Sequence, residues 1–499
     1  MIHPTQLSTL LKAAIPLLFM IWILWWMGAP ARDYHEVLRQ FKGQRGLFVN
    51  DMLEHEVGGP FDGTPIQELC ASKTWTQGLI VSCDPAQGGI GHVRNAHLTC
   101  VRLAIEAGAE LILPGIVRRS ENDISKLNKV ANPKGPLRGV HPSYLFDTEH
   151  LKSSLQAHCP QMKVYNSIDD LASEPSVLSA LKFDPATLPV PKTEGGTLAR
   201  PDKWLRQFNE WMDRESPKDK RKYPVRVHIP SLCFYWPVFW DGPEFARQFG
   251  RILRPHENAR RLAAAALYSM NKRYGWHWEP RKEQIKKGSF VGVHLRTEQD
   301  AVERFPQYTT QGAEYLNFMA YANLSITFVA HGATATGVDI FSLRARDFGI
   351  TVVEKRELLE PQDATFLDRM SFDQQGTVDF EILQRAALHT GSSASTFSWN
   401  VALRRNTMSE DYGGVAIGDK SEKSDLAVEK REVERRAAGE LGDFDAIAKG
   451  QAAAKAAGGG GVGAVPGSGD GRIRWVDEFG ILYGNDGTQT RAMAEGMWP

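Results

Sequence analysis

Histidine and arginine side chains flank a glycine-rich turn in the stretch GGIGHVRNAH, residues 88–97. Gly89 and Gly91 let the backbone approach a ligand closely, and the free N–H groups of a helix N-terminus favour anions. His92 and Arg94 add a titratable group and a fixed cation. The turn departs from the dinucleotide-binding fingerprint, because Arg94 stands where a third glycine is needed. The pattern fits an anionic ligand, or else a tight strand–helix turn that binds nothing.

A second stretch, FVGVHLRTEQD at residues 290–300, places charged side chains at the end of an apolar strand. The strand period of two puts His294 and Arg296 on one face, at the carboxyl end where open α/β sheets bind ligands. The fork of Arg296 suits two phosphate oxygens. The alternative is that Arg296 only forms an ion pair with Glu298 or Asp300.

A third stretch is VDFEILQRAALHTGSSASTFSWNVALRR, residues 378–405. It predicts a helix that begins near Asp379, a hydroxyl-rich turn, and a second helix. Ser395 and Thr396 lie at the start of that second helix. Hydroxyl side chains there either cap the helix or hold a phosphate beside its dipole.

The surrounding elements predict the fold that positions these residues. Short apolar runs such as 79–81, 109–114, 289–296 and 325–332 alternate with segments of helical periodicity. Such runs are typical of parallel sheets covered on both faces. We therefore expect an α/β protein with two such domains in tandem. The polar stretch near 184–225 is expected to be a surface insertion.

The composition and the N-terminus constrain the setting of the protein. Lys+Arg and Asp+Glu both number 59 among 499 residues, so the chain has no excess of positive charge that would indicate a nucleic-acid partner. Residues 13–31 carry no charge and would span roughly 28 Å as a helix, about one hydrocarbon core. They predict a signal-anchor with the bulk of the chain in the lumen. A signal peptide cleaved after Ala31 is the alternative.

Five cysteines predict one or two disulfides and at least one free thiol in an oxidising lumen, with the pairing left open. The predicted organisation is a cytosolic tail at 1–12, a transmembrane signal-anchor at 13–31, a stem at 32–75, an N-terminal Rossmann-like domain at 76–250, a C-terminal Rossmann-like donor-binding domain at 251–416, a flexible low-complexity insert at 417–472, and a C-terminal segment at 473–499 with two possible edge strands.

Together with LFDTEHL at residues 145–151, the three stretches resemble the GDP-fucose protein O-fucosyltransferase superfamily, in particular its fungal and plant-like members. The resemblance covers roughly residues 78–405. It implies a GT-B architecture, in which two Rossmann-like domains face each other across a cleft. It also implies that the donor substrate is GDP-fucose, bound mainly by the C-terminal domain.

By this resemblance, Arg296 contacts the β-phosphate and stabilises charge on the departing GDP. His294 supports the nucleotide, and Asp379 reads the guanine. Phosphate contacts and nucleotide packing come from Ser395, Thr396 and Phe397. The loop that contains Gly89, Gly91 and Arg94 closes over the fucose.

The chain departs from the family pattern at the position of the catalytic base and at one position near the donor, and its Asp-x-Asp motif does not lie at a strand end. Some members supply a glutamate from the glycine loop, and this chain has none there, so His92 becomes the candidate that orients or deprotonates the acceptor hydroxyl. His331 and Gly332 stand where the family frequently has an acidic residue. The one Asp-x-Asp motif, at 443–445, lies inside the low-complexity insert. We therefore expect metal-independent chemistry with no cofactor.

The expected function is an inverting fucosyltransferase of the Golgi or ER membrane, single-pass and type II, with its catalytic body in the lumen. Its partners are a nucleotide-sugar donor, a hydroxyl acceptor on a protein Ser or Thr or on a glycan, and the membrane. One alternative is a GT-B glycosyltransferase that uses another nucleotide sugar. Another is a catalytically silent lumenal protein that binds sugars or nucleotides.

Overall fold

The computed structural model describes residues 32–120, 124, 126–127, 139–296, 298, 305–332, 335–409, 412, 473–484 and 488–499. The predicted signal-anchor at 13–31 and the predicted insert at 417–472 lie outside these residues. None of the helices in the described ranges is long and apolar enough to cross a bilayer.

The first half of the chain forms a five-stranded parallel sheet with the order β3-β2-β1-β5-β4. At its centre, Ile80 of β1 is in register with Glu110 of β2 and Arg226 of β5. The strands are β1 Leu79–Cys83, β2 Glu110–Ile112, β3 Val164–Tyr165, β4 Leu181–Lys182 and β5 Val225–Ile229.

The second half forms a six-stranded sheet with the order β10-β11-β9-β6-β7-β8. Its strand pairs are parallel except for β10 and β11, which are antiparallel. The strands are β6 Val291–Leu295, β7 Ile326–His331, β8 Thr351–Val353, β9 Leu388–Ser392, β10 Ile473–Asp477 and β11 Gly480–Tyr483. The predicted α/β class with parallel sheets is confirmed, and the C-terminal segment does add strands at the sheet edge.

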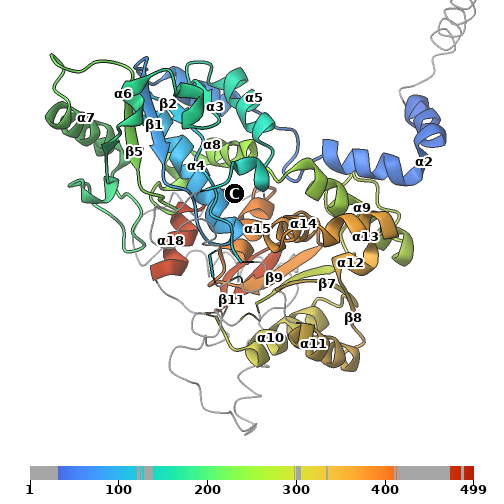
Figure 1. Cartoon of the computed structure of the whole chain (residues 1–499). Coiled ribbons are helices and arrows are strands. Elements are labelled where there is room, and N and C mark those ends of the chain that lie inside the picture. Colours follow the sequence, from blue (N-terminus) through green and yellow to red (C-terminus); the bar gives the residue numbers. More distant parts are fainter. Residues whose placement is uncertain are drawn as a thin grey trace, which may run out of the picture.

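Helices surround both sheets (Figure 1). The α-helices are α2 Arg32–Glu54, α3 Thr64–Ala71, α4 Ile90–Ala107, α5 Thr148–His158, α6 Pro175–Leu178, α7 Trp204–Glu215, α8 Pro243–Phe249, α9 Glu257–Tyr274, α10 Tyr308–Tyr321, α11 Ala335–Asp347, α12 Lys355–Leu358, α13 Pro361–Asp368, α14 Phe372–Gln384, α15 Thr396–Asn406 and α18 Thr488–Gly496. Short 3-10 helices are η1 Pro142–Tyr144, η2 Ile168–Leu171, η3 Pro185–Thr187, η4 Pro201–Lys203, η5 Val238–Asp241 and η6 Gly250–Ile252.

Local signals fix the ends of the helices that lie between the two sheets. α4 begins after Gly89, whose backbone is extended, and ends at Gly108, whose φ of 59° suits glycine. α14 begins with a capping box between Ser371 and Gln374. At α15, the Ser395 side chain accepts a hydrogen bond from the backbone N–H of Ser398. α4, α14 and α15 therefore start at defined residues between the two domains (Figure 1).

The segment expected to be a stem is partly built into the fold. α2 packs against α9, and its Phe48, Val49 and Met52 belong to the core of the second domain. α3 joins the first domain through Ile66 and through a disulfide between Cys70 and Cys159. These residues cannot act as a free spacer, because their apolar faces are already buried.

Two other expectations are corrected by the packing. The stretch near 184–225 is not a surface insertion, because α7 buries Trp204, Phe208 and Met212 in the first core. The domain boundary at residue 251 is also too early, since Ile252 and Leu253 still belong to that core.

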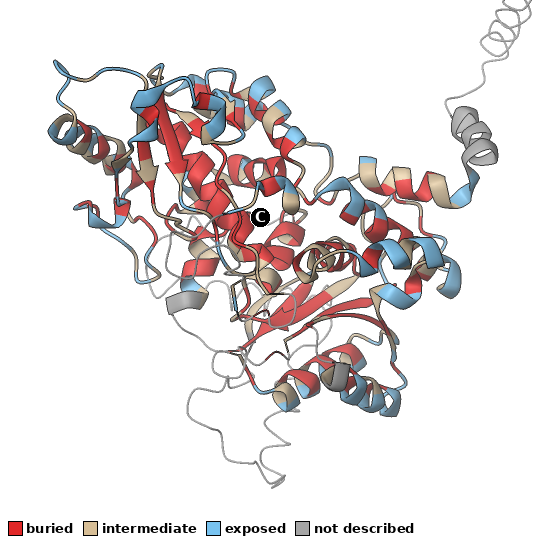
Figure 2. Cartoon of the chain, viewed as in Figure 1, coloured by how far each residue is buried: buried red, intermediate tan, exposed pale blue. Residues whose placement is uncertain are grey.

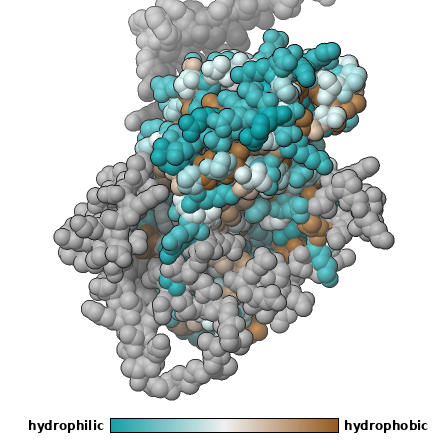
Figure 3. All heavy atoms as spheres, turned by 90° about the vertical axis from the view of Figure 1, so that its left-hand side faces the viewer, coloured by the Kyte–Doolittle hydropathy of each residue, from teal (hydrophilic) through white to brown (hydrophobic). Residues whose placement is uncertain are grey.

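Burial follows the layers of the fold. Both sheets and the helices between them are buried, whereas the outer faces of the surrounding helices are exposed (Figure 2). On the face that carries α7, hydrophilic side chains predominate and apolar ones are scattered among them (Figure 3).

Candidate active site between the two domains

A cavity of about 470 Å³ lies between the domains, where the loop after β1 faces the carboxyl ends of β6 and β7. This volume is in the range of small-molecule sites. The α14 helix and the N-terminus of α15 complete its wall. Among the sequence-predicted site residues, the lining includes Gly89, His92, His294, Arg296, Asp379, Ser395, Thr396 and Phe397.

Two helix N-termini meet at this cavity. α4 contributes Gly89 and Ile90 to the lining, and α15 contributes Thr396 and Phe397. The first N–H groups of a helix have no acceptor within the helix, and the helix dipole favours negative charge there. Ser395 caps α15 by accepting from the N–H of Ser398, 3.3 Å away, so the capping role and the cavity position coexist. The arrangement suits an anion held between the domains.

Gly91 is the point of closest approach between α4 and α15. A Cβ atom on Gly91 would lie 2.4 Å from the carbonyl oxygen of Thr396. Gly91 itself does not line the cavity. Its role in this structure is to let the two helix N-termini come together, while Gly89 lies at the cavity wall.

His294 supports α15 from the neighbouring strand. Its Nδ1 atom lies 2.8 Å from the Oγ atom of Ser398, and its ring packs 4.6 Å from that of Phe397. Burial lowers the pKa of His294 well below its usual value, and Arg296 and His389 lower it further. The imidazole is therefore neutral, which fits a hydrogen-bonding and packing role better than a charged one.

Arg296 borders the cavity and forms an ion pair with Glu298. Gln311 holds its backbone by accepting from the Arg296 N–H at 3.1 Å and donating to its carbonyl at 3.0 Å. Gly332 makes room for the Glu298 carboxylate, which a Cβ atom on Gly332 would overlap. The ion pair that we considered as an alternative is thus present, and both partners face the cavity.

Asp379 is a buried carboxylate with one oxygen in use. Its Oδ2 atom accepts from the Nζ atom of Lys355 at 2.8 Å, whereas Oδ1 has no partner among the described residues. Burial raises the pKa of Asp379, although Lys355 acts in the opposite direction. A buried acceptor without a donor is costly, so this oxygen is suited to an N–H group of a ligand.

The two polar side chains of the glycine loop are not placed together. His92 lines the cavity with its ring 5.8 Å from that of Phe234, and burial lowers the pKa of His92. Arg94 does not reach the cavity. Its buried guanidinium donates to backbone carbonyls, including those of Leu253 at 3.2 Å and Trp498 at 2.9 Å. We correct the expectation that Arg94 is a cation at the mouth of the site.

Several cavity residues have only weak sequence signals. Lys355, which lines an adjoining cavity, lies two residues after the short apolar strand β8, and this position near the carboxyl end of a strand is its only signal. Arg119 lines the cavity and donates to Asp373 at 2.9 Å. His331, at the end of β7, lies 2.8 Å from Glu354 in an adjoining cavity of about 390 Å³. In the described ranges, no three His, Cys, Asp or Glu side chains are grouped as metal ligands.

No family model and no curated protein matches the sequence. In fold, the protein is similar to a crystal structure of POFUT1 in complex with GDP-fucose, with a TM-score of 0.39 and 13% identity, over 67% of this chain and 96% of that chain. It is also similar to NodZ alpha-1,6-fucosyltransferase co-crystallized with GDP, with a TM-score of 0.33 and 15% identity, over 66% and 93% of the two chains. The fucosyltransferase NodZ from Bradyrhizobium has a TM-score of 0.33 and 16% identity, over 66% and 92%. Because these TM-scores are low, we infer the function from the residues of the cavity.

Proposed function

We propose that the protein is an inverting, metal-independent glycosyltransferase that moves fucose from GDP-fucose to a hydroxyl group of a protein Ser or Thr. The observation that carries this proposal is the meeting of two helix N-termini with Arg296 at one cavity between two α/β domains. Preorganised N–H groups and a fixed cation stabilise charge that develops on a departing diphosphate.

Different residues of the cavity would bind the diphosphate and the guanine of the donor. The N–H groups of Thr396 and Phe397 and the guanidinium of Arg296 would bind the diphosphate. Arg296 would then exchange all or part of its contact with Glu298 for the phosphate. The unpartnered Oδ1 atom of Asp379 would accept from the N–H groups on the edge of guanine.

On the acceptor side, His92 is the candidate that orients or deprotonates the hydroxyl group. Burial lowers the pKa of His92, so its imidazole is neutral at neutral pH and can accept a proton. Inversion requires the acceptor oxygen to attack the sugar carbon opposite the bond to the departing GDP. Proton transfer to His92 would accompany that attack.

One observation favours a second function of another class. The ion pair of Arg296 with Glu298 neutralises the cation that the transfer mechanism needs. A protein that binds sugars or nucleotides without catalysis could keep this pair closed. The use of another nucleotide sugar or of a glycan acceptor is a variant of the first proposal.

Calorimetric titration separates these functions at the level of binding. We expect saturable binding of GDP-fucose, weaker binding of GDP-mannose, and no binding of UDP-sugars. Asp379→Asn should weaken GDP-fucose binding, because an amide that offers N–H groups to the guanine edge is mismatched. Tighter binding of a UDP-sugar would reject the donor assignment. Donor binding without any release of GDP over hours would favour the silent binding protein.

We also propose that the catalytic body lies in the lumen of the Golgi or ER, behind a single type II signal-anchor at 13–31. The two disulfides fit an oxidising compartment. Protease added to intact microsomes should spare nearly the whole chain, and a carbonate wash should leave it in the membrane. Recovery in the carbonate supernatant would favour a cleaved signal peptide.

A further inference from the structure

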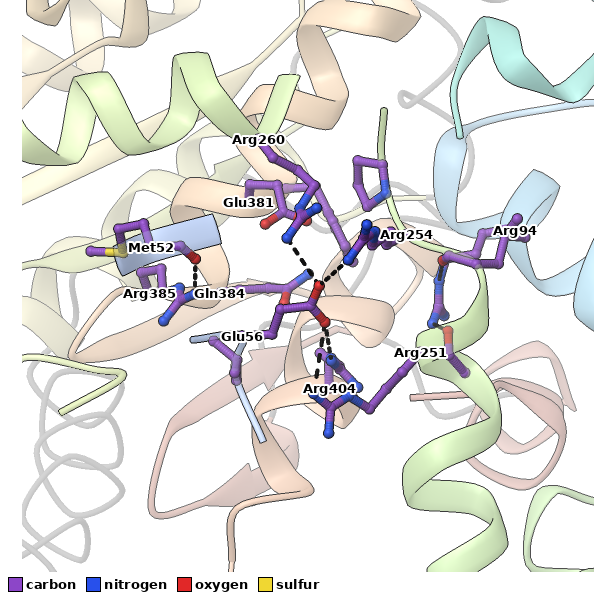
Figure 4. A pocket seen from close by; sticks show the side chains of 15 residues that line it. Met52, Glu56, Arg94, Arg251, Arg254, Arg260, Glu381, Gln384, Arg385 and Arg404 are labelled. Carbon is purple, nitrogen blue, oxygen red and sulfur yellow. Dashed lines mark hydrogen bonds and ion pairs between the residues drawn. The ribbon is translucent and has the colours of Figure 1, made fainter. Parts of the chain in front are cut away.

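A second cavity, of about 30 Å³, lies behind the site and has an unusual lining. Figure 4 shows arginine side chains converging on it from several elements. Its charged lining residues are Arg94, Arg251, Arg254, Arg260, Arg385, Arg404, Glu56 and Glu381. Arginines therefore outnumber the carboxylates at this place.

Most of these arginines have good hydrogen-bond acceptors. The Oε1 atom of Glu56 accepts from Arg254 at 3.0 Å and from Arg260 at 2.9 Å. Arg254 also donates to Asp147. Arg94 and Arg385 donate to backbone carbonyls. These side chains are explained by the protein alone.

Arg404 and Arg251 are satisfied only in part, although the Nη atoms of Arg251 donate to the carbonyl oxygens of Gly59 and Pro60. They reach the Oε2 atom of Glu56 only at 3.8 and 3.7 Å, which is longer than a hydrogen bond. The Nη1 atom of Arg404 and the Nε atom of Arg251 are buried without a hydrogen-bond partner in the described part of the chain. The Arg404 side chain is only 8% exposed. Two buried donors at one cavity indicate an acceptor of negative charge.

We infer that this cavity binds a small inorganic anion the size of chloride, contacted by Arg404 and Arg251. A volume of about 30 Å³ holds roughly two water-sized atoms, which is too little for a nucleotide or a sugar phosphate. A water molecule could satisfy the N–H groups, but it would leave the excess positive charge uncompensated. Water is therefore the rival occupant.

The anion would join the two domains at one side of the active site. Arg404 lies in α15, whose first turn borders the larger cavity, and Arg251 lies in η6. The residue after η6, Leu253, belongs to the core of the first domain, whereas Val401 of α15 belongs to that of the second. Occupancy would thus stabilise the contact between the domains, whether or not the protein is a transferase.

The test is the thermal unfolding of wild-type protein in sodium chloride, sodium bromide or sodium gluconate at equal ionic strength. Gluconate is too large for the cavity. We expect chloride and bromide to raise the Tm by roughly 2–4 °C in a saturable manner, and gluconate to have no such effect. Equal Tm values in chloride and gluconate would overturn the inference.

A matched pair of variants separates this site from general salt effects. Arg404→Met removes the guanidinium whose Nη1 atom lacks a hydrogen-bond partner and keeps similar length, so the response to chloride should disappear. Arg206→Gln alters an exposed arginine of α7, whose side chain is 67% exposed, and should keep the full response. A chloride response that persists in a folded Arg404→Met protein would overturn the proposal.

Crystals of the wild-type protein grown in bromide keep the proposal testable if Arg404→Met does not fold. An anomalous bromide peak between Arg404 and Arg251 is expected. Density for water at that position, without an anomalous signal, would establish water as the occupant and overturn the inference.

Discussion

Arg296 can be either a donor clamp or the structural partner of Glu298, and kinetics distinguish the two. If it stabilises charge on departing GDP, Arg296→Ala should slow GDP release from GDP-fucose by about 10²–10³-fold while changing donor affinity much less. Arg296→Lys should not restore the rate, because lysine lacks the planar fork. The measurement is the rate of GDP release, the donor Kd and the Tm of each variant.

Glu298→Gln provides the control for this prediction. If Glu298 only occupies Arg296 in the absence of donor, the variant should keep Arg296 active and hold or raise the rate of GDP release. If the pair is structural, Arg296→Ala and Glu298→Gln should lower the Tm alike and leave the rate nearly unchanged. That second outcome would contradict the proposed mechanism.

Glu56 predicts a pH dependence of stability. Burial raises its pKa, but Arg260, Arg404, Arg251 and Arg254 lower it more, from 4.5 to about 2. A carboxylate whose pKa is lowered in the folded state stabilises the fold at pH values above its unfolded-state pKa. This contribution is lost as the pH falls toward the folded-state pKa. The contribution is about 3 kcal/mol at neutral pH and should fade below about pH 4.5.

Urea unfolding of wild type and Glu56→Gln checks this window. The variant should be clearly less stable at pH 7, and the difference in stability should narrow as the pH falls from about 4.5 toward 2, where the Glu56 carboxylate of the wild type becomes protonated. Asp202→Asn, at an exposed carboxylate paired with Arg200, is the control and should show no such gap. A gap that stays constant from neutral to acid pH would contradict the assignment.

For individual residues, the sequence predicted those that lie at the ends of apolar strands or at helix starts. Arg296 and Ser395 were predicted from such positions, and both line the cavity. Asp379 lines it too, but the expected helix start at Asp379 is wrong, because α14 already begins at Phe372 and Asp379 lies inside it. Arg94 was misplaced, because two residues along a helix turn a side chain by about 200° from the direction of His92. Lys355 could not be selected, since its partner, the Asp379 carboxylate, is distant in sequence.

At the scale of the elements, the contact of α4 with α15 determines whether the donor-binding cavity forms between the two helix N-termini. A Cβ atom on Gly91 would lie 2.4 Å from the backbone oxygen of Thr396, which can give way only if a helix moves. Gly91→Ala should therefore destabilise the protein by about 1–3 kcal/mol and weaken donor binding. Denaturant midpoints and donor Kd values measure both effects.

Gly89→Ala is the matched control, because no atom of the described residues lies within 4 Å of a Cβ atom there and its φ is −75°. Its stability should stay within about 0.5 kcal/mol of wild type. If both glycine variants lose the same stability, the close approach of the two helices is not what Gly91 provides.

The elements themselves were largely predictable, since the apolar runs at 79–81, 289–296 and 325–332 became parallel strands. The packing between segments that are distant in the sequence was not predictable. α2 packs on α9, and α7 fills the first core with Trp204 and Phe208. An apolar stripe on a short helix shows that it is covered, but not by which part of the chain.

For the whole molecule, the disulfides predict a definite thiol count. Cys70 pairs with Cys159 and Cys83 with Cys100, while Cys233 is a buried free thiol. The denatured, unreduced chain should therefore take up one alkyl group from iodoacetamide, and five after reduction, by mass spectrometry. Uptake of three or five groups without reduction would contradict the disulfide assignment and weaken the case for an oxidising compartment.

The central claim, that a GDP-sugar lies between the two domains, is tested most directly by a crystal structure of the wild-type protein with GDP-fucose. We predict the diphosphate between the N–H groups of Thr396 and Phe397 and the guanidinium of Arg296, with the guanine edge on the Oδ1 atom of Asp379. A nucleotide bound elsewhere, or one that leaves the Arg296–Glu298 pair and the Asp379 oxygen without new partners, would contradict the account.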